Sequence, residues 1–505
     1  MSFTKKLFSR RFFLINLVLI GIMLGFGSAF LVFTSLGNGR SGSRVEVDAE
    51  TRPEPEASTA QAISTAESLQ LAFNYVANTV LPSVVELQVL ITSQGASPAD
   101  QQLPWRFFFG DPGEGGEIPS IPDQESEGLG SGVIVRKTGR TAYILTNAHV
   151  VQSASEILVR LFDEDEYEGK IIGIDERRDL ALVSFETNRT DIRVALLGNS
   201  DAIKIGDWTV AVGSPFGLFS SVTIGVISAV GRDGGPDGNI SDFIQTDAAI
   251  NRGNSGGALA NIKGEIIGIN TWIASPSGGS IGLGFSIPIN NTKRVIDDLI
   301  AHGSVRYGWL GVLLQTLERD SLASLGIPDS ARGAMVGSLF STGPAAKSGM
   351  LPGDFVTAID GRRISSTEQL VRIVGDLPAG TESVFQLIRN GRSLEVRVSI
   401  EERLSNQDYS FLWPGLEVAA LSQETRNRLR LDTEISGVVL LSVLPRTPAA
   451  VLALQPGDII TAINGVSIRS ILDFYVQLNN PRSTEVRFTV YRDGQSVSTL
   501  AIVRK

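Results

Sequence analysis

The sequence predicts a mainly β protein of several domains, with one N-terminal helix able to cross a membrane. Short β-branched runs separated by turn residues fill positions 80–290, which is typical of a sandwich or barrel. A duplicated pattern occupies the C-terminal part from residue 305 onward. One long apolar segment lies near the start. The length of 505 residues fits several domains, at roughly 100–200 residues each.

The composition is that of globular domains, with 42% hydrophobic and 19% charged residues. A net charge of −10 argues against a nucleic-acid partner, because such proteins carry a basic face. The absence of cysteine excludes disulfides, thiolate metal sites and a cysteine nucleophile. With only His149 and His302 in the chain, we expect no metal centre and no cofactor.

The apolar segment covers residues 12–33, and no charge occurs between Arg11 and Arg40. A helix of 22 residues would be about 33 Å long, enough for a hydrocarbon core of about 30 Å. The alternative is a cleaved signal peptide, whose apolar region is usually about 7–15 residues and precedes a small-residue cleavage site. The sequence after residue 33 has no clear site of that kind, so we expect residues 1–34 to form an anchor.

The flanking charges give an orientation for this anchor. The basic residues before it slightly outnumber those after it, which favours the N-terminus inside and the bulk of the chain outside. Residues 35–64 are rich in Gly, Ser, Pro and Glu and are expected to form a flexible tether. The tract 95–130 is rich in Gly, Pro and acid but contains WRFFF at 105–109, which should dock on another surface.

The predicted strands lie within a domain of residues 65–303, which is long enough for two barrels. Each is a short β-branched or aromatic run bounded by turn residues. The clearest of these runs are 83–91, 130–137, 142–151, 156–162, 180–186, 208–214 and 264–273.

Three segments of this domain carry chemistry. His149 follows an apolar strand in TNAHV, Asp179 opens the strand DLAL, and Ser255 lies in the loop GNSGG. A serine hydroxyl needs an adjacent base to become a nucleophile. Histidine has the right pKa, and a buried carboxylate fixes its tautomer. The flanking glycines allow the N–H groups of Gly253 and Ser255 to point at one oxyanion.

Each piece alone has a structural explanation. A Gly-Ser-Gly loop is often only a turn, His149 could be a buried histidine, and Asp175 or Asp163 could replace Asp179. Together, in β-rich surroundings with no other histidine in the barrels, they favour a catalytic triad. His302 lies at the end of a predicted helix closed by Gly303, where a histidine suits the helix dipole.

TNAHVV, DLALV and NRGNSGGAL resemble the motifs of the HtrA (Deg) family of trypsin-like PDZ serine proteases. GINTWIA and IGLGFSIPI resemble the same family, and the likeness covers residues 65–505. The resemblance implies a chymotrypsin-like double β-barrel, ATP-independent proteolysis of unfolded or damaged proteins, and trimers as the basic assembly. It also places the tract 95–130 where the family has a regulatory loop.

The resemblance further implies an S1 pocket, the pocket for the P1 side chain before the cleaved bond. In trypsin-like proteases its base lies six residues before the nucleophile, which here is Ala249. Ile250 is beside it, and Ile273 is expected nearby. A small apolar pocket suits Val, Ala or Ile at P1. A missing methylene is worth only about 1–3 kcal/mol, so the preference should be soft.

The duplication has a constant offset, because LPGDFVTAIDGRRI (351–364) matches QPGDIITAINGVSI (455–468). The pattern resembles PDZ domains, here at 305–404 and 409–505. PDZ domains add a peptide as an extra strand and hold its terminal carboxylate in a nest of backbone N–H groups. The alternative is two spacer or contact modules. The nest residues are Leu310, Gly311 and Val312 in the first copy, and Pro414, Gly415 and Leu416 in the second, where proline lacks an N–H.

These features favour a serine endopeptidase of envelope protein quality control, tethered to the outer face of a bacterial cytoplasmic membrane. Its expected partners are unfolded proteins, C-terminal peptides at the first PDZ copy, and two or more further copies of the chain. One alternative is a regulatory stress-sensing protease that cuts one membrane-bound target. Another is a holding chaperone or peptide-binding scaffold with a silent protease, against which the intact triad argues.

Overall fold

The computed structural model describes residues 57–91, 126–214, 221–233, 235, 239–276, 278–317, 319–328, 330–404 and 406–503. The apolar segment 12–33 and the aromatic run 105–109 lie outside them. Within the described ranges, no helix combines the length and the hydropathy needed to cross a membrane. The chain divides into two compact units, residues 1–68 and 69–505.

The first described element is helix α2, Ala57–Val80. Its start corrects the sequence prediction, because residues 57–64 were assigned to the flexible tether. The stretch is polar like a linker, but it is rich in alanine and free of glycine and proline, which favours a helix. Near its C-terminal end, Val76 and Val80 are fully buried, and the Phe73 ring packs edge-on against Trp208.

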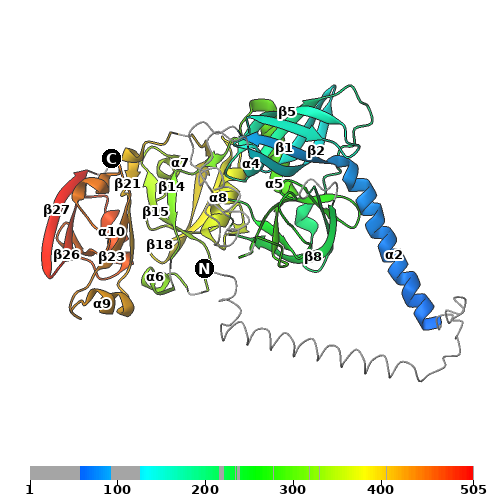
Figure 1. Cartoon of the computed structure of the whole chain (residues 1–505). Coiled ribbons are helices and arrows are strands. Elements are labelled where there is room, and N and C mark those ends of the chain that lie inside the picture. Colours follow the sequence, from blue (N-terminus) through cyan, green and yellow to red (C-terminus); the bar gives the residue numbers. More distant parts are fainter. Residues whose placement is uncertain are drawn as a thin grey trace, which may run out of the picture. The chain divides into compact units, whose positions relative to one another are not determined.

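The next residues form two closed six-stranded barrels, with strand orders β1-β2-β3-β6-β5-β4 and β10-β11-β12-β9-β8-β7. In Figure 1 the strands of the first barrel run from blue to cyan and those of the second are green. This confirms the double β-barrel expected from the short runs. The strands are β1 Val84–Ile91, β2 Ser126–Thr138, β3 Thr141–Thr146, β4 Glu156–Arg160, β5 Glu166–Asp175, β6 Leu180–Glu186, β7 Trp208–Gly213, β8 Ser221–Arg232, β9 Phe243–Thr246, β10 Ala258–Asn261, β11 Ile266–Ile273 and β12 Gly284–Pro288.

Each barrel has its own core of branched aliphatic side chains, and a third cluster lies between the barrels and helix α5, Ile289–His302. This helix ends at Gly303, which has a left-handed φ of 70°. The N–H of Gly303 donates to the Leu299 carbonyl and so caps the helix. His302 lies exposed in the last turn, which confirms the prediction made for it.

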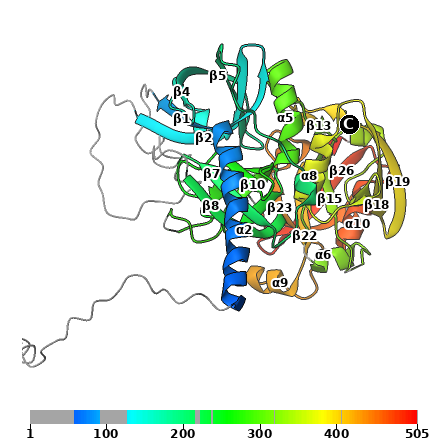
Figure 2. The ribbon, with the colours of Figure 1, turned by 90° about the vertical axis from the view of Figure 1, so that its right-hand side faces the viewer.

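The duplicated region forms two similar sheets. Figure 2 shows the first copy in yellow-green to yellow and the second in orange to red. The first copy contains β13 Gly308–Trp309, β14 Val312–Gln315, α6 Arg319–Ser324, β15 Ala334–Phe340, α7 Pro344–Lys347, β16 Phe355–Ile359, β17 Arg362–Arg363, α8 Thr367–Asp376, β18 Glu382–Arg389, β19 Arg392–Ser399 and β20 Glu401–Glu402. The second contains β21 Leu412–Trp413, β22 Leu416–Ala420, α9 Gln423–Leu429, β23 Val438–Val443, β24 Ile459–Ile463, β25 Val466–Ser467, α10 Ile471–Leu478, β26 Glu485–Arg492 and β27 Gln495–Val503.

Residues at matching positions of the two copies make the same contacts, as the sequence duplication leads one to expect. Ser366 caps α8 and Ser470 caps α10, each by accepting a backbone N–H three residues later. Asp354 and Asp458 are buried and each is paired with an arginine, at 2.6 Å and 2.5 Å.

The two copies also share one hydrophobic cluster, which the sequence did not predict. Met335 and Phe355 of the first copy pack in the same cluster as Trp413 and Tyr475 of the second. Strand β21 of the second copy adds to the sheet of the first by pairing with β15. The copies therefore form a tandem with a common core.

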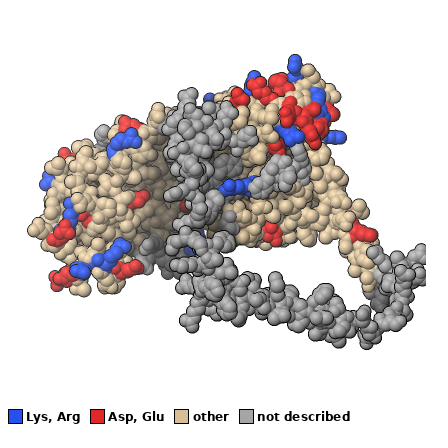
Figure 3. Space-filling view, viewed as in Figure 1, with Lys and Arg blue, Asp and Glu red and all other residues tan. Residues whose placement is uncertain are grey.

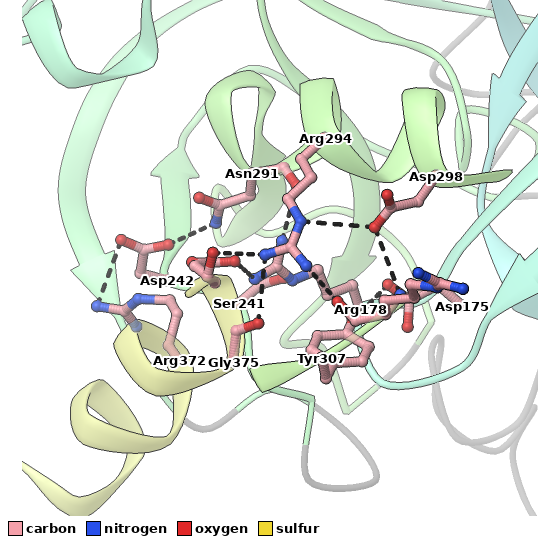
Figure 4. A network of polar contacts seen from close by, with 12 residues as sticks. Asp175, Arg178, Ser241, Asp242, Asn291, Arg294, Asp298, Tyr307, Arg372 and Gly375 are labelled. Carbon is pink, nitrogen blue, oxygen red and sulfur yellow. Dashed lines mark hydrogen bonds and ion pairs between the residues drawn. The ribbon is translucent and has the colours of Figure 1, made fainter. Parts of the chain in front are cut away.

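A polar network joins the double barrel to the first copy (Figure 4). Arg178 is 2% exposed and its guanidinium binds Asp376 at the end of α8 and the backbone carbonyl of Asn291. Arg294 donates to the carbonyls of Asp376 and Arg306. Burial alone would lower the pKa of Arg178, but Asp376 raises it, and the net shift is upward.

Candidate active site

His149 lies in the short helix α4, Ala148–Val151, directly after strand β3. Its ring is buried, and its Nδ1 is 2.9 Å and 2.8 Å from the two carboxylate oxygens of Asp179. The backbone N–H of His149 also donates to Asp179 Oδ1 at 3.0 Å. Two contacts to one carboxylate fix the position of the ring and its Nδ1–H tautomer.

Asp179 opens β6 with a φ of 55°, which is uncommon for a residue with a Cβ atom. Hydrogen bonds hold it there. Thr271 Oγ1 donates to Asp179 Oδ2 at 2.7 Å, and Asn147 Nδ2 donates to the Asp179 carbonyl at 2.9 Å. Because Thr271 belongs to β11, the second barrel helps to orient a carboxylate of the first.

Ser255 lies in a turn that only glycine can form on its C-terminal side. Gly256 has a φ of 81°, and a Cβ there would lie 2.1 Å from the Ser131 carbonyl oxygen. A Cβ at Gly257 would lie 2.3 Å from the Val212 carbonyl oxygen. The Ser255 hydroxyl donates to the Thr271 carbonyl at 2.9 Å. Attack on a substrate therefore requires the hydroxyl to turn from Thr271 toward His149.

The N–H groups predicted to form the oxyanion hole lie in this same loop. Gly253 has a φ of 95°, and its carbonyl accepts the Ser131 hydroxyl at 2.5 Å. Within the described ranges, the backbone N–H groups of Gly253 and Ser255 donate to no other residue. Among the described residues, no acceptor competes with a substrate oxygen for either group.

The other two aspartates considered from the sequence have different partners. Asp175 accepts a hydrogen bond from the Tyr307 hydroxyl, and burial raises the pKa of Asp175 above its ordinary range. Asp163 binds Arg189 at 2.5 Å, together with Asp165. Figure 3 shows acidic and basic side chains intermingled over the first barrel. The structure thus brings Asp179, and neither of these, to His149.

The three residues predicted to form the S1 pocket lie in the second barrel. Ile250 and Ile273 are buried in one cluster with Leu259, and Ala249 is partly buried beside it. The Ala249 carbonyl accepts the Thr223 hydroxyl at 2.9 Å. The assignment of these three residues to the S1 pocket stays a prediction.

Sequence reasoning missed two residues of this site, Thr271 and Ser131. Besides its hydroxyl bond to Gly253, Ser131 donates its N–H to the Ser255 carbonyl at 2.8 Å. Thr271 contacts both Asp179 and Ser255. Their only signals were the GSG run at 130–132 and the GINTWIA motif, neither of which indicates a partner more than 90 residues away.

The first copy of the duplication has an open groove at its predicted nest. A cavity of about 260 Å³ lies between β14 and α8 and includes Leu310, Gly311 and Val312 in its wall. Gly311 has a φ of 77°, which exposes successive backbone N–H groups on one side. Apolar side chains of α8, Leu370 and Val374 among them, line the opposite wall.

The second copy is closed at the equivalent place. Pro414 has no N–H, and the N–H of Gly415 donates to the Ser338 hydroxyl of the first copy at 3.2 Å. A Cβ at Gly415 would lie 2.2 Å from Thr447 Cβ, so this loop is tightly packed. Of the three backbone groups of this nest, one is missing and a second is already bonded.

No group of three or more His, Asp or Glu side chains suited to a metal ion occurs in the described parts of the chain. Comparison with protein families matches a trypsin-like peptidase domain at residues 130–269 and PDZ domains at 308–400 and 439–492. These matches fall within the double barrel and the two copies of the duplication.

Two curated relatives span most of the chain. The probable periplasmic serine endoprotease DegP-like of Pseudomonas fulva is 40% identical over 404 residues, covering 76% of this chain and 80% of the relative. The periplasmic serine endoprotease DegP of Escherichia coli strain K12 is 37% identical over 424 residues, covering 80% and 86%.

Solved structures agree with these relatives. The HtrA-type protease AlgW with a decapeptide is 36% identical, covers 66% of this chain and 99% of its own, and gives a TM-score of 0.53. The same protease with a tripeptide is 34% identical, with a TM-score of 0.53. The chain therefore belongs to the HtrA (Deg) family of trypsin-like serine endoproteases with C-terminal PDZ domains.

Proposed function

We propose that this serine endopeptidase works without ATP in the bacterial cell envelope, where it degrades or processes unfolded or damaged proteins. The periplasmic relatives support the compartment. The main support for serine-protease catalysis is the pairing of the Asp179 carboxylate with His149 Nδ1, together with a serine in a Gly-rich turn.

His149, Asp179 and Ser255 form the proposed triad. Ser255 Oγ bonds to the scissile carbonyl carbon while its proton passes to His149 Nε2. Asp179 stabilises the imidazolium, and the N–H groups of Gly253 and Ser255 bind the oxyanion. His149 then gives the proton to the leaving amine. Water, activated by the same histidine, hydrolyses the acyl-enzyme.

The proposed assembly has three further parts. Residues 12–33 anchor the chain in the cytoplasmic membrane, with the protease and PDZ domains outside. The family resemblance supports a homotrimer, and the open nest of the first PDZ domain supports binding of peptide C-termini there. A regulatory protease that cuts one membrane-bound target is the second candidate, which the apolar segment favours.

The test is digestion of unfolded casein by the purified full-length chain in mild detergent. The wild type should cleave it without ATP, and Ser255→Ala should lose on the order of 10⁶ in kcat. Metal chelators should have no effect. Cleavage sites should cluster after Val, Ala and Ile, because Ala249, Ile250 and Ile273 leave no acid for a basic P1 side chain.

Three results would count against the proposal. Cleavage by Ser255→Ala at the wild-type rate would show that Ser255 is not the nucleophile. A wild-type chain that binds casein without cutting it would favour a holding chaperone. Preference for Lys or Arg at P1 would contradict the pocket while leaving the triad intact.

A further inference from the structure

An arginine of the protease domain lies in the wall of the groove of the first PDZ domain. Arg177 stands in the turn between β5 and β6, two residues before Asp179, and it lines the same cavity as Leu310, Gly311 and Val312. A second arginine, Arg403, lines it from the PDZ side. The groove is therefore built from two domains.

The two arginines differ in burial, because Arg177 is partly buried and Arg403 is exposed. The Arg177 guanidinium lies over the Tyr307 ring, 4.5 Å from its centroid, and its buried Nη1 has no hydrogen-bond partner among the described residues. No ion pair of Arg177 or Arg403 with a described carboxylate occurs. Burial, and after it repulsion from Arg403, lowers the pKa of Arg177. The nearby Asp175 carboxylate acts in the opposite direction, but it forms no ion pair with Arg177. One buried guanidinium nitrogen of Arg177 therefore has room for an acceptor at the groove.

The two arginines lie at the nest end of the groove. Tyr307, under Arg177, directly precedes strand β13, and its carbonyl accepts the Arg403 N–H at 2.8 Å. The C-terminal end of α8 is here too, because a Cβ at Gly308 would lie 2.3 Å from the Val374 carbonyl oxygen. The opposite end of the groove is marked by the bond between the Thr316 and Thr367 hydroxyls, at 3.1 Å.

We propose that Arg177 and Arg403 bind the terminal carboxylate of a peptide seated in this groove, together with the backbone N–H groups of the nest. The inference rests on the proposed peptide-binding function of the first PDZ domain. A carboxylate has about four acceptor sites, so three nest donors leave room for a guanidinium. Arg177 thus makes the carboxylate site a joint property of the PDZ domain and the protease domain.

The experiment compares two peptides in one protein. The full-length Ser255→Ala chain is titrated by fluorescence anisotropy with a decapeptide that ends in valine and has no acidic side chain. The peptide is used as the free acid and as the C-terminal amide. The variants Arg177→Gln and Arg403→Gln are added to the Ser255→Ala chain, and the matched control is Arg140→Gln, an exposed arginine of the same domain outside the cavity.

The parent chain should bind the acid more tightly than the amide. The measured quantity is the ratio of the Kd for the amide to the Kd for the acid. Each of Arg177→Gln and Arg403→Gln should reduce this ratio about tenfold, because loss of a hydrogen bond to a charged group weakens binding by about that factor. Arg140→Gln should leave the ratio unchanged. The ratio is measured within each variant, so a general loss of stability does not alter it.

Two outcomes would overturn the inference and are separable. If the parent chain binds acid and amide equally, peptide C-terminus recognition itself fails, and this inference fails with it. If the parent prefers the acid but Arg177→Gln keeps the full ratio, or weakens both peptides equally, Arg177 only shapes the groove. The proposed function of the nest would then stand without it.

Discussion

Asp179 combines a left-handed backbone with the carboxylate that contacts His149. A positive φ costs a residue with a Cβ atom about 1–2 kcal/mol, and asparagine and aspartate tolerate it best. The hydrogen bonds from Thr271 and Asn147 offset this cost. The position therefore accepts Asn without a change of backbone, which allows a clean test of the charge.

We expect Asp179→Asn to keep the fold and to lower kcat by roughly 10⁴, because an amide favours the wrong histidine tautomer. The matched variant is Asp175→Asn, four residues earlier and bonded to Tyr307, away from His149. Its effect on kcat should be within a few-fold. Steady-state cleavage of a peptide substrate and thermal unfolding would measure both. If Asp175→Asn lowered kcat strongly and Asp179→Asn only mildly, Asp175 and not Asp179 would be the acid of the triad.

Residue types in short motifs made His149, Asp179 and Ser255 predictable, because each stands in a recognisable local pattern. Thr271 and Ser131 were not predictable in the same way. A threonine on a strand and a serine between glycines are common, and their roles depend on partners in the other barrel or loop. Arg177 was missed for the same reason, since DERRD resembles an ordinary charged turn.

At the scale of elements, the two nests differ more than the sequence indicated. The missing N–H of Pro414 was readable from the sequence. The bond from Gly415 to Ser338 was not, because it depends on strand β21 joining the sheet of the first copy. The start of α2 at Ala57 was missed because its polar, alanine-containing sequence has the composition of a linker.

The nests predict how many peptides one chain holds. Isothermal titration of the full-length Ser255→Ala chain with a free-acid, hydrophobic-ended peptide should give one site per chain, because the second nest lacks the N–H of Pro414 and its Gly415 N–H is already bonded. Gly311→Asp should remove that site, since aspartate tolerates the positive φ and its charge repels the peptide carboxylate. Two equal sites, or one that survives Gly311→Asp, would contradict the reading of the nests.

For the whole molecule, the sequence predicted the order of the domains but not how they contact one another. The apolar residues shared by the two PDZ copies look, in sequence, like two separate cores. The contact between the protease and the first PDZ domain depends on Arg178, which sits between Arg177 and Asp179. Its partner, Asp376, is a single acid at the end of an ordinary helix. Neither residue carries a motif.

Asp376→Asn should loosen this contact, because it removes the carboxylate that pairs with the buried Arg178 guanidinium. Leaving a buried donor without its partner costs about 1–3 kcal/mol. The lower end applies here, since the Asp376 side chain is 43% exposed and water can replace it. Amides of residues 303–310 should then exchange with solvent about tenfold faster by mass spectrometry, which corresponds to about 1.4 kcal/mol.

The matched control for that variant is Asp233→Asn, at the same domain boundary. Asp233 pairs with Arg372 at 3.3 Å, but Arg372 keeps a second carboxylate, Asp242, at 3.4 Å. Its guanidinium therefore retains a counter-charge, and exchange of residues 303–310 should stay within about twofold of the wild type, as for other surface pairs. If both variants accelerated exchange equally, the boundary would depend on total charge. If neither did, Arg178 would hold its place through the Asn291 carbonyl and the Tyr307 ring alone.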